Sequence, residues 1–346
     1  MNRNTKVNNR VISVAAFVVL FILMMGGIFF GVTIYTQPQA PTYRLATTSK
    51  DSSNATPVES TTTLVAVPTA LSENLPQVCG QSGSWIILAL GRTIHKSVAP
   101  AEMIRLMKVD FDQKSAVIYS FPPDLVVETP GLTEKYQIRA LALQDIFRAI
   151  VLSDGENKTT ETDASQATAQ AILDNFGIAA DHYLTIKEDL VEEMVYIVGG
   201  IDVDMPQDFT MPESSTYQGL VLEAGNQHLD GEMVHAITTY RENAVDEPYR
   251  IENQNAVLGG MWKKLLDPLV YVRIPELYST YKEDIITDLN VEQIAALNCL
   301  VRLIPPKNVS FDSPTIEQLI VKEDGATYMK NPEQLITEIQ ALFSEQ

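Results

Sequence analysis

The chain has 346 residues, of which 45% are apolar, and this content is enough for a buried core and excludes a wholly disordered protein. Its 44 acidic residues outnumber 25 lysines and arginines, and the resulting formal charge of -19 would repel a nucleic-acid backbone. Two cysteines and four scattered histidines are too few for a disulfide framework or a Cys-rich zinc module. We therefore expect a globular protein that does not bind nucleic acid.

The amino terminus carries an uncharged apolar stretch at residues 11–35. At about 1.5 Å per residue, a helix of this length exceeds the roughly 30 Å hydrocarbon core of a bilayer. A retained transmembrane helix, acting as a signal-anchor, is favoured over a cleaved signal peptide, whose apolar region is usually about 7 to 15 residues long. Arg3, Lys6 and Arg10 precede the stretch without an acid among them, which predicts that residues 1–10 form a cytoplasmic tail. We expect a single-pass protein of the cell membrane, with an extracytoplasmic C-terminal domain.

Within the predicted span, Gly27 and Gly31 are four residues apart. Small residues at this spacing allow two membrane helices to approach closely. Flexible packing or chance produces the same pair more often. A dimer is therefore left open by the sequence.

The composition changes after the apolar stretch. Residues 36–76 are rich in Pro, Ser, Thr, Asn and Ala and cannot bury enough apolar surface to offset the entropy lost on ordering. They are predicted to be a disordered extracytoplasmic stalk. Residues 77–346 are predicted to form one domain, and the polar stretch at residues 153–166 is predicted to be a surface loop within it.

Strands and helices alternate along this domain. Short apolar runs rich in β-forming residues predict strands at residues 85–90, 106–111, 117–121, 183–186 and 201–205. Helical spacing and capping residues predict helices at residues 168–175, 190–198, 230–241, 250–266 and 290–304, and a last one opened by Asn331 and Pro332. This order favours an α/β fold, a three-layer α-β-α sandwich around a mixed central sheet.

Two arginines stand at the edge of apolar helix faces. Helical spacing places Arg241 on the side of its predicted helix that should face the core. In the next helix, Arg250 and Gln254 share a stripe with Val257 and Met261. The two guanidinium groups could converge on an anion with an apolar tail, or each could pair internally with an acid of this acidic chain. Spacing alone leaves both interpretations open.

Several segments resemble, in order and in spacing, the LytR-CpsA-Psr (LCP) family, also described as the cell envelope-related transcriptional attenuator domain. They are residues 102–131, 176–206, 225–232 and 250–258. A short cytoplasmic tail, one span and an exported domain are also typical of this family. The resemblance supports the predicted fold and domain organisation.

This resemblance implies a function. Family members are phosphotransferases that take a glycopolymer from a polyprenyl pyrophosphate carrier and attach it to peptidoglycan or another envelope acceptor. It implies catalytic roles for Arg241, Arg250 and Asp124, and a site for Mg²⁺ or another divalent cation at Glu102 and Asp124. Guanidinium groups and a cation would neutralise a pyrophosphate, and an apolar slot would hold the prenyl tail.

The sequence also departs from the family pattern. Three positions where the family has arginine carry Pro100, Pro123 and Thr239. Each lost charge-assisted contact is worth roughly 1.5 to 3 kcal/mol. Arg92 and Arg105 could compensate, and with Gln254 they are predicted to bind substrate. A divergent transferase, a catalytically silent binder of a polyprenyl-linked glycan, and a structural or regulatory envelope protein all stay open.

Cys79 and Cys299 are the two cysteines, and both are exported under this topology. An oxidising compartment would allow a bond between the start of the domain and a late helix. The sequence does not decide whether the bond forms.

Overall fold

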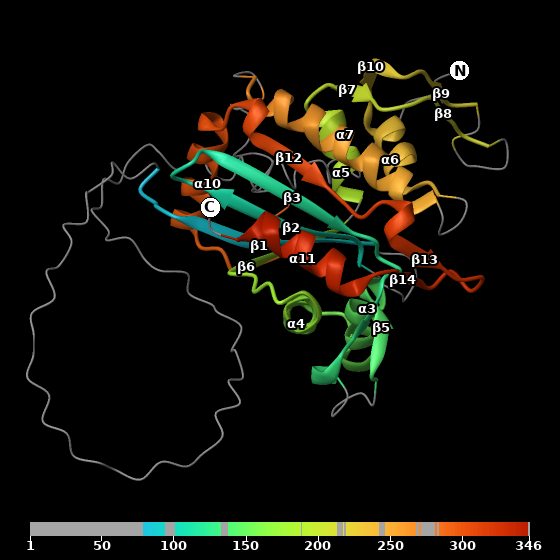
Figure 1. Ribbon diagram of the computed structural model, residues 1–346. Coiled ribbons are helices and arrows are strands. Elements are labelled where there is room, and N and C mark those ends of the chain that lie inside the picture. Colours follow the sequence, from blue (N-terminus) through green and yellow to red (C-terminus); the bar gives the residue numbers. More distant parts are fainter. Residues whose placement is uncertain are drawn as a thin grey trace, which may run out of the picture.

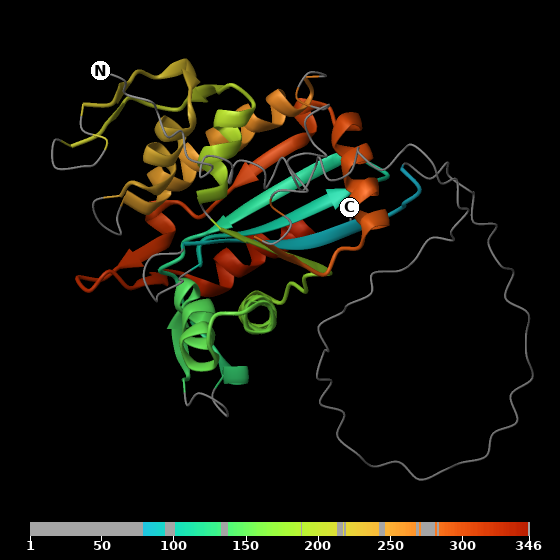
Figure 2. The same ribbon diagram turned by 180° about the vertical axis from the view of Figure 1, so that it is seen from behind.

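The computed structural model describes residues 79–93, 101–132, 138–187, 189–212, 217, 219–241, 246–267, 270, 281 and 284–344 (Figures 1 and 2). The predicted tail, membrane span and stalk lie outside these residues and stay predictions. None of the helices in the described ranges is long and apolar enough to cross a membrane.

A six-stranded sheet forms the centre of the domain, in the order β11-β6-β1-β2-β3-β12. Its strands are β1 (Ser84–Arg92), β2 (Ala101–Asp110), β3 (Ser115–Phe121), β6 (His182–Lys187), β11 (Ile285–Thr287) and β12 (Val309–Asp312). The pairs β1–β6 and β3–β12 are parallel and the other three are antiparallel. The predicted mixed sheet is confirmed, and β2 begins five residues before the predicted strand 106–111.

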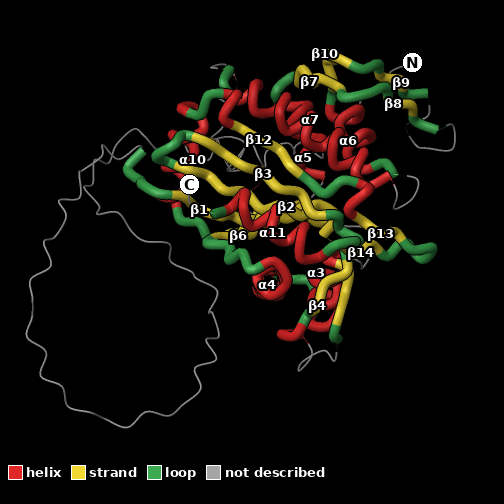
Figure 3. The backbone as a smooth tube through the Cα atoms, in the orientation of Figure 1, coloured by secondary structure: helices red, strands yellow, loops and turns green. Residues whose placement is uncertain are grey.

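Helices cover both faces of this sheet (Figure 3). In β1, Ile87 packs into one apolar cluster and Leu88 into a second cluster, because successive side chains of a strand point to opposite faces. The first cluster includes α5 (Asp189–Ile197), α6 (Gly231–Thr239), α7 (Glu247–Leu265) and α10 (Val291–Leu303). The second includes α3 (Leu143–Asp154), α4 (Lys158–Phe176) and α11 (Pro332–Phe343). The predicted three-layer α-β-α sandwich is thus confirmed.

Short strand pairs and 3-10 turns lie outside the six-stranded sheet. They are the strand pairs β4 (Val126–Glu128) with β5 (Ala140–Ala142), β7 (Ile201–Met205) with β10 (Gly225–Leu229), β8 (Phe209–Thr210) with β9 (Val221–Leu222) and β13 (Leu319–Val321) with β14 (Thr327–Met329), and the 3-10 turns η2 (Pro306–Asn308) and η3 (Ile316–Gln318). The strand predicted at residues 201–205 is β7.

The prediction of a surface loop at residues 153–166 is wrong, because most of this stretch is the first half of α4. Asn157 caps the helix by accepting a hydrogen bond from the Thr160 backbone N–H at 3.1 Å. The buried stripe of this half is largely polar, and Ser165 Oγ donates to the Glu161 carbonyl at 2.7 Å. A polar but buried stripe leaves no apolar periodicity, so hydropathy does not reveal the first half of α4, whereas the second half agrees with the helix predicted at residues 168–175.

Helix ends agree closely with the expected capping residues. Helix α5 stops before Gly199 and Gly200, whose φ angles of 77° and 86° lie in the left-handed region that favours glycine. The Asp230 side chain caps α6 by accepting from the Met233 backbone N–H at 2.9 Å. Helix α6 ends at Thr239, so Arg241 follows the helix instead of lying on its core-facing side as predicted.

A disulfide joins Cys79 to Cys299, and their Cα atoms are 5.6 Å apart. The bond links the first residue that the structure describes to α10, across a separation of 220 residues. The question that the sequence left open is therefore answered in favour of the bond.

Candidate functional site

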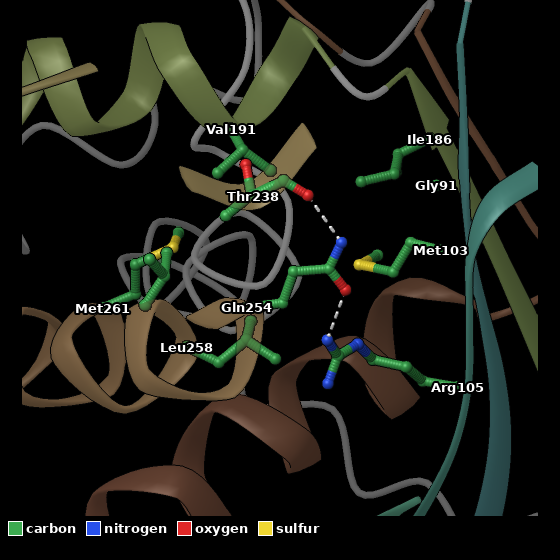
Figure 4. A pocket seen from close by; sticks show the side chains of 10 residues that line it. Gly91, Met103, Arg105, Ile186, Val191, Thr238, Gln254, Leu258 and Met261 are labelled. Carbon is green, nitrogen blue, oxygen red and sulfur yellow. Dashed lines mark hydrogen bonds between the residues drawn. The ribbon is translucent and has the colours of Figure 1, made fainter. Parts of the chain in front are cut away.

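A pocket that is partly open to solvent lies between the sheet and the helices α5, α6 and α7. Its wall is mostly apolar, with Thr238, Gln254 and Arg105 as its polar members (Figure 4). The lining residues are Gly91, Met103, Arg105, Ile186, Val191, Thr238, Gln254, Val257, Leu258 and Met261.

Helix α7 supplies one wall of this pocket and the charged groups next to it. Arg250, Gln254, Val257 and Met261 are all buried on one stripe, as helical spacing predicts. The last three line the pocket, and Arg250 lies one turn before Gln254. The stripe therefore joins an apolar wall to a guanidinium group at its edge.

Gln254 is fixed by two hydrogen bonds (Figure 4). Its Nε2 donates to the Thr238 carbonyl at 2.8 Å, which ties α7 to α6. Its Oε1 accepts from Arg105 Nη2 at 2.9 Å, which ties α7 to β2. With both ends of the carboxamide engaged, Gln254 holds the Arg105 guanidinium against the pocket.

Asp124 and Arg241 meet beside this wall. Asp124 lies in the turn after β3, where Leu125 donates its backbone N–H to the Pro122 carbonyl at 3.0 Å. The Asp124 carboxylate accepts hydrogen bonds from Arg241 Nη1 and from Gln144 Nε2. Arg241 Nη1 also donates to Glu247 Oε2 at 3.0 Å. The turn and the segment after α6 thus bring two predicted site residues together.

Arg250 also contacts Glu247. Its Nε and Nη2 donate to the two oxygens of Glu247 at 3.0 and 2.8 Å, and Nη2 also donates to the Glu102 backbone carbonyl at 3.2 Å. The Glu102 carboxylate lies 3.7 Å from Arg250 Nη1. The predicted residues Asp124, Arg241, Arg250 and Glu102 are therefore brought together around Glu247.

This cluster contains two guanidinium groups and three carboxylates. Burial acts to lower the pKa of Arg241, but the hydrogen bond to Asp124 and the negative charge of Glu247 outweigh it and raise that pKa. Both arginines are thus paired with acids of the chain. Of the two interpretations that the sequence left open, the internal ion pair describes this structure, formed with Asp124 and Glu247.

Arg105 differs from these two arginines. It is 2% exposed, and its Nη groups donate to two neutral carboxamides, Gln254 Oε1 and Asn255 Oδ1. Burial, and then the nearby charge of Arg250, lower the pKa of Arg105 from 12.5 to about 9, against the opposing charge of Glu247. At neutral pH the side chain is still a cation.

Arg92 does not line the pocket, contrary to the substrate-binding role predicted for it. It ends β1 with its side chain on the α4 side of the sheet, where Nη2 lies 2.8 Å from Glu161 Oε2. Both side chains are 5% exposed. Because Glu161 lies on the α4 side of the sheet, its contact keeps the Arg92 guanidinium away from the cluster around Glu247, which lies on the other side.

The predicted cation site at Glu102 and Asp124 lacks further ligands. Over the residues with a described position, no group of three or more His, Cys, Asp or Glu side chains is arranged to hold a metal ion. Both oxygens of Asp124 already accept hydrogen bonds from protein donors. These residues do not fit a metal ion as they stand, so we derive no chemical step through one, and the divalent cation stays a prediction.

Glu247 and Asn255 are the important site residues that the sequence did not reveal. Glu247 lies three residues before Arg250, a spacing that places the two side chains next to each other on a helix. This spacing could have identified the acid. Asn255 carries no comparable signal, because its role depends on contact with Arg105, 150 residues away.

The protein is thus an α/β protein with a three-layer α-β-α sandwich. It has an apolar pocket beside paired arginines and carboxylates. The chain belongs to the LytR_cpsA_psr family, whose sequence model matches residues 45–344. The predicted resemblance is thereby confirmed.

Named relatives agree with this assignment. The chain is 22% identical over 233 residues to the polyisoprenyl-teichoic acid–peptidoglycan teichoic acid transferase TagV of Bacillus subtilis (strain 168), a match that spans 66% of this chain and 55% of TagV. The crystal structure of B. subtilis TagV superimposes with a TM-score of 0.56 at 19% identity, covering 77% of this chain and 99% of that one. TagT bound to LIIa-WTA gives a TM-score of 0.53 at 19% identity, covering 79% and 97%. At these identities the structures establish a shared fold.

Proposed function

We propose that this protein acts on polyprenyl-pyrophosphate-linked glycopolymers during assembly of the cell envelope, anchored in the cell membrane by residues 11–35. The observation that carries the proposal is the apolar pocket bordered by two arginines that converge on Glu247. An apolar slot next to guanidinium groups complements a hydrocarbon tail joined to a phosphate. The name of TagV describes transfer from a polyisoprenyl carrier to peptidoglycan, which is consistent with this chemistry.

Under this proposal the reaction is a phosphoryl transfer. A hydroxyl of peptidoglycan or of another envelope acceptor attacks the phosphorus that bears the glycan and loses its proton. The bond from that phosphorus to the bridging oxygen breaks, and polyprenyl phosphate leaves. Arg241 and Arg250 would stabilise the negative charge that develops on the phosphoryl oxygens. Glu247 would hold both guanidinium groups in place.

A catalytically silent binder of the same lipid-linked glycan is the second candidate. It is favoured by the balance of charge, because three carboxylates around two guanidinium groups leave no net positive charge for a pyrophosphate. The family arginines replaced by Pro123 and Thr239 would have added to that charge. A binder needs the pocket but does not need to stabilise a transition state.

Transfer and binding can be separated with the full-length protein in lipid nanodiscs. The substrate is a polyprenyl-pyrophosphate-linked glycan, offered with peptidoglycan fragments in Mg²⁺ or in EDTA. We expect the glycan to appear on the acceptor and polyprenyl phosphate to be released. Retention of the lipid-linked glycan without turnover would select the silent binder, and absence of both would contradict the proposal. Loss of transfer in EDTA would support the predicted cation.

Arg241→Ala tests the placement of the headgroup. We expect this variant to bind the lipid-linked substrate more weakly, because a charge-assisted contact is removed. Arg148→Ala is the control, since Arg148 pairs with Asp145 on the exposed surface of α3. Equal affinities of the Arg241 variant and the unaltered protein at low salt would exclude Arg241 from the site.

A further inference from the structure

The carboxylate of Asp124 is held between two donors of the protein. Its Oδ2 accepts a hydrogen bond from Arg241 Nη1, and its Oδ1 accepts one from Gln144 Nε2. The backbone N–H of Gln144 also donates to the Pro123 carbonyl at 2.9 Å, so Gln144 is bonded to this turn twice. A ligand that approaches the carboxylate would therefore meet the donors of Arg241 and Gln144 beside it.

The other carboxylates of the cluster are paired with guanidinium groups as well. Buried Glu247 accepts three hydrogen bonds, one from Arg241 and two from Arg250. Glu102 is the most open of the three acids, with a side chain that is 32% exposed, and it lies 3.7 Å from Arg250 Nη1. Mg²⁺ is usually bound by one or two carboxylates together with water and phosphate oxygens. Here each such carboxylate already has a cationic neighbour.

Positive charge thus occupies the place in which the divalent cation was predicted. An ion between Glu102 and Asp124 would lie beside Arg241, which contacts Asp124, and beside Arg250, which lies next to Glu102. Like charges at short range repel each other, and more strongly where water is partly excluded. The guanidinium groups already neutralise the acids that a metal ion would otherwise neutralise.

Arg241 also keeps two donors for a ligand. Its contacts with described residues all use Nη1, which is shared by Asp124 and Glu247. Nε and Nη2 form the opposite edge of the guanidinium and have no acceptor among the residues with a described position, and the side chain is 24% exposed. Arg250 uses the same edge for its two hydrogen bonds to Glu247. A phosphate could accept from this edge of Arg241 while Nη1 stays on the acids.

We infer that Arg241 takes the place of a divalent cation at Asp124, and that the site binds the pyrophosphate of its substrate without a metal ion. The inference rests on the proposed function for the substrate and deepens it, because it names the cationic group that the site uses. It replaces the divalent cation predicted at Glu102 and Asp124. A guanidinium suits this place, since it is always charged and presents two parallel donors to a phosphate.

Binding of Mn²⁺ tests this inference independently of turnover. The full-length protein in nanodiscs of zwitterionic lipid is titrated with Mn²⁺ without substrate, and the bound ion is measured by electron paramagnetic resonance. We expect the unaltered protein and Asp124→Asn to bind Mn²⁺ equally, because Asp124 is not a metal ligand under the inference. The acidic surface attracts ions in both proteins, so the difference between them reports on the site.

Removal of the guanidinium should create a metal site. Arg241→Met leaves the three carboxylates with one guanidinium fewer. We expect this variant to bind Mn²⁺ at least about tenfold more tightly than the unaltered protein, because a like charge is removed. The gain should be lost in the double variant Arg241→Met/Asp124→Asn. Arg241→Lys keeps the charge and should show no gain, and neither should the surface control Arg148→Met.

Binding of farnesyl pyrophosphate gives a second measurement on the same proteins. The unaltered protein should bind this probe at least as tightly in EDTA as in Mg²⁺. Arg241→Met should bind it about tenfold more weakly or worse in EDTA, because charge-assisted hydrogen bonds are removed. The Arg148 variant should behave as the unaltered protein.

A Mn²⁺ site that is present in the unaltered protein and absent in Asp124→Asn would overturn the inference. A loss of farnesyl pyrophosphate affinity of about tenfold or more in EDTA would also overturn it. Absence of the Mn²⁺ gain in folded Arg241→Met would show that Arg241 does not replace a cation. Should this variant not fold, the comparison of the unaltered protein with Asp124→Asn decides.

Failure of the proposed function has a different signature. If farnesyl pyrophosphate binds neither in EDTA nor in Mg²⁺, the proposed function is contradicted. The Mn²⁺ titrations do not depend on this probe, so the two failures are distinguishable.

Discussion

Arg250 donates two hydrogen bonds to Glu247, from Nε to Oε2 at 3.0 Å and from Nη2 to Oε1 at 2.8 Å. The two residues are one turn apart on α7, and their side chains are 1% and 3% exposed. Such a two-point contact fixes the orientation of a guanidinium as well as its position. Because Glu247 also accepts from Arg241, one carboxylate orients both arginines of the site.

Glu247→Gln should destabilise the protein by about 3 kcal/mol or more, because it leaves the buried Arg250 charge without its closest counter-ion. The free energy of unfolding in urea measures this effect. Asp145→Asn removes the exposed partner of Arg148 and should change stability by less than about 0.5 kcal/mol. Similar losses in both variants would mean that the Glu247 pair has no special importance for stability.

Replacement by alanine should have opposite effects on stability at two adjacent glycines of α7, Gly259 and Gly260. A Cβ at Gly260 would lie 2.7 Å from the Asp202 carbonyl oxygen on β7, so Gly260→Ala should cost about 1 to 3 kcal/mol. A Cβ at Gly259 meets nothing within 4 Å, and Gly259→Ala should stabilise the helix by up to about 1 kcal/mol. Thermal unfolding of the two variants checks the sign. A tolerated Gly260→Ala would show that α7 can move away from β7.

Reduction of the bond between Cys79 and Cys299 should lower the free energy of unfolding by about 2 to 5 kcal/mol. The bond closes a long loop and so restricts the unfolded chain. Urea unfolding with and without a reductant measures the loss, and mass spectrometry should find both thiols alkylated only after reduction. A variant with both cysteines changed to serine is the control, and its stability should not depend on the reductant.

Stability should also depend on Glu161. Burial raises the pKa of this carboxyl above its ordinary value of 4.5, although the charge of Arg92 opposes the shift. A raised pKa in the folded state adds stability below pH 4.5 that is lost as the pH rises through the folded-state pKa.

Glu161→Gln removes this contribution. The stability of the unaltered protein minus that of the variant should therefore decrease as the pH rises above 4.5. Urea unfolding of both proteins at several pH values gives this difference. A difference that stays constant or grows with pH would show that the Glu161 pKa is not raised.

The layers of the fold could be predicted from the sequence because their signals are local. The apolar run of β1 and the caps at Asp230 and Asn290 are visible within a few residues. The second half of α4 was predicted, as the helix at residues 168–175, but its first half was missed because its buried stripe contains polar residues whose partners are distant or within its own backbone. The strand β12 was missed as well, since its parallel partner β3 lies almost 200 residues earlier.

The site could be predicted only in part. Helical spacing correctly gave the stripe of Arg250 and Gln254, but the position of Arg241 depends on where α6 ends. The direction of Arg92 depends on Glu161, a buried acid in the half of α4 that was predicted to be a loop. Pairing between distant charges is a tertiary property, so residue type and spacing alone did not separate the paired arginines from Arg105.

The strand β1 has the disulfide near its start and the pocket near its end, where Gly91 lies beside Ile186 of β6. From Ser84 to Gly91 the strand advances by seven residues, or about 23 Å at about 3.3 Å per residue. Under the proposed anchoring, the connection to the membrane therefore joins the described domain near the end of β1 that is away from the pocket.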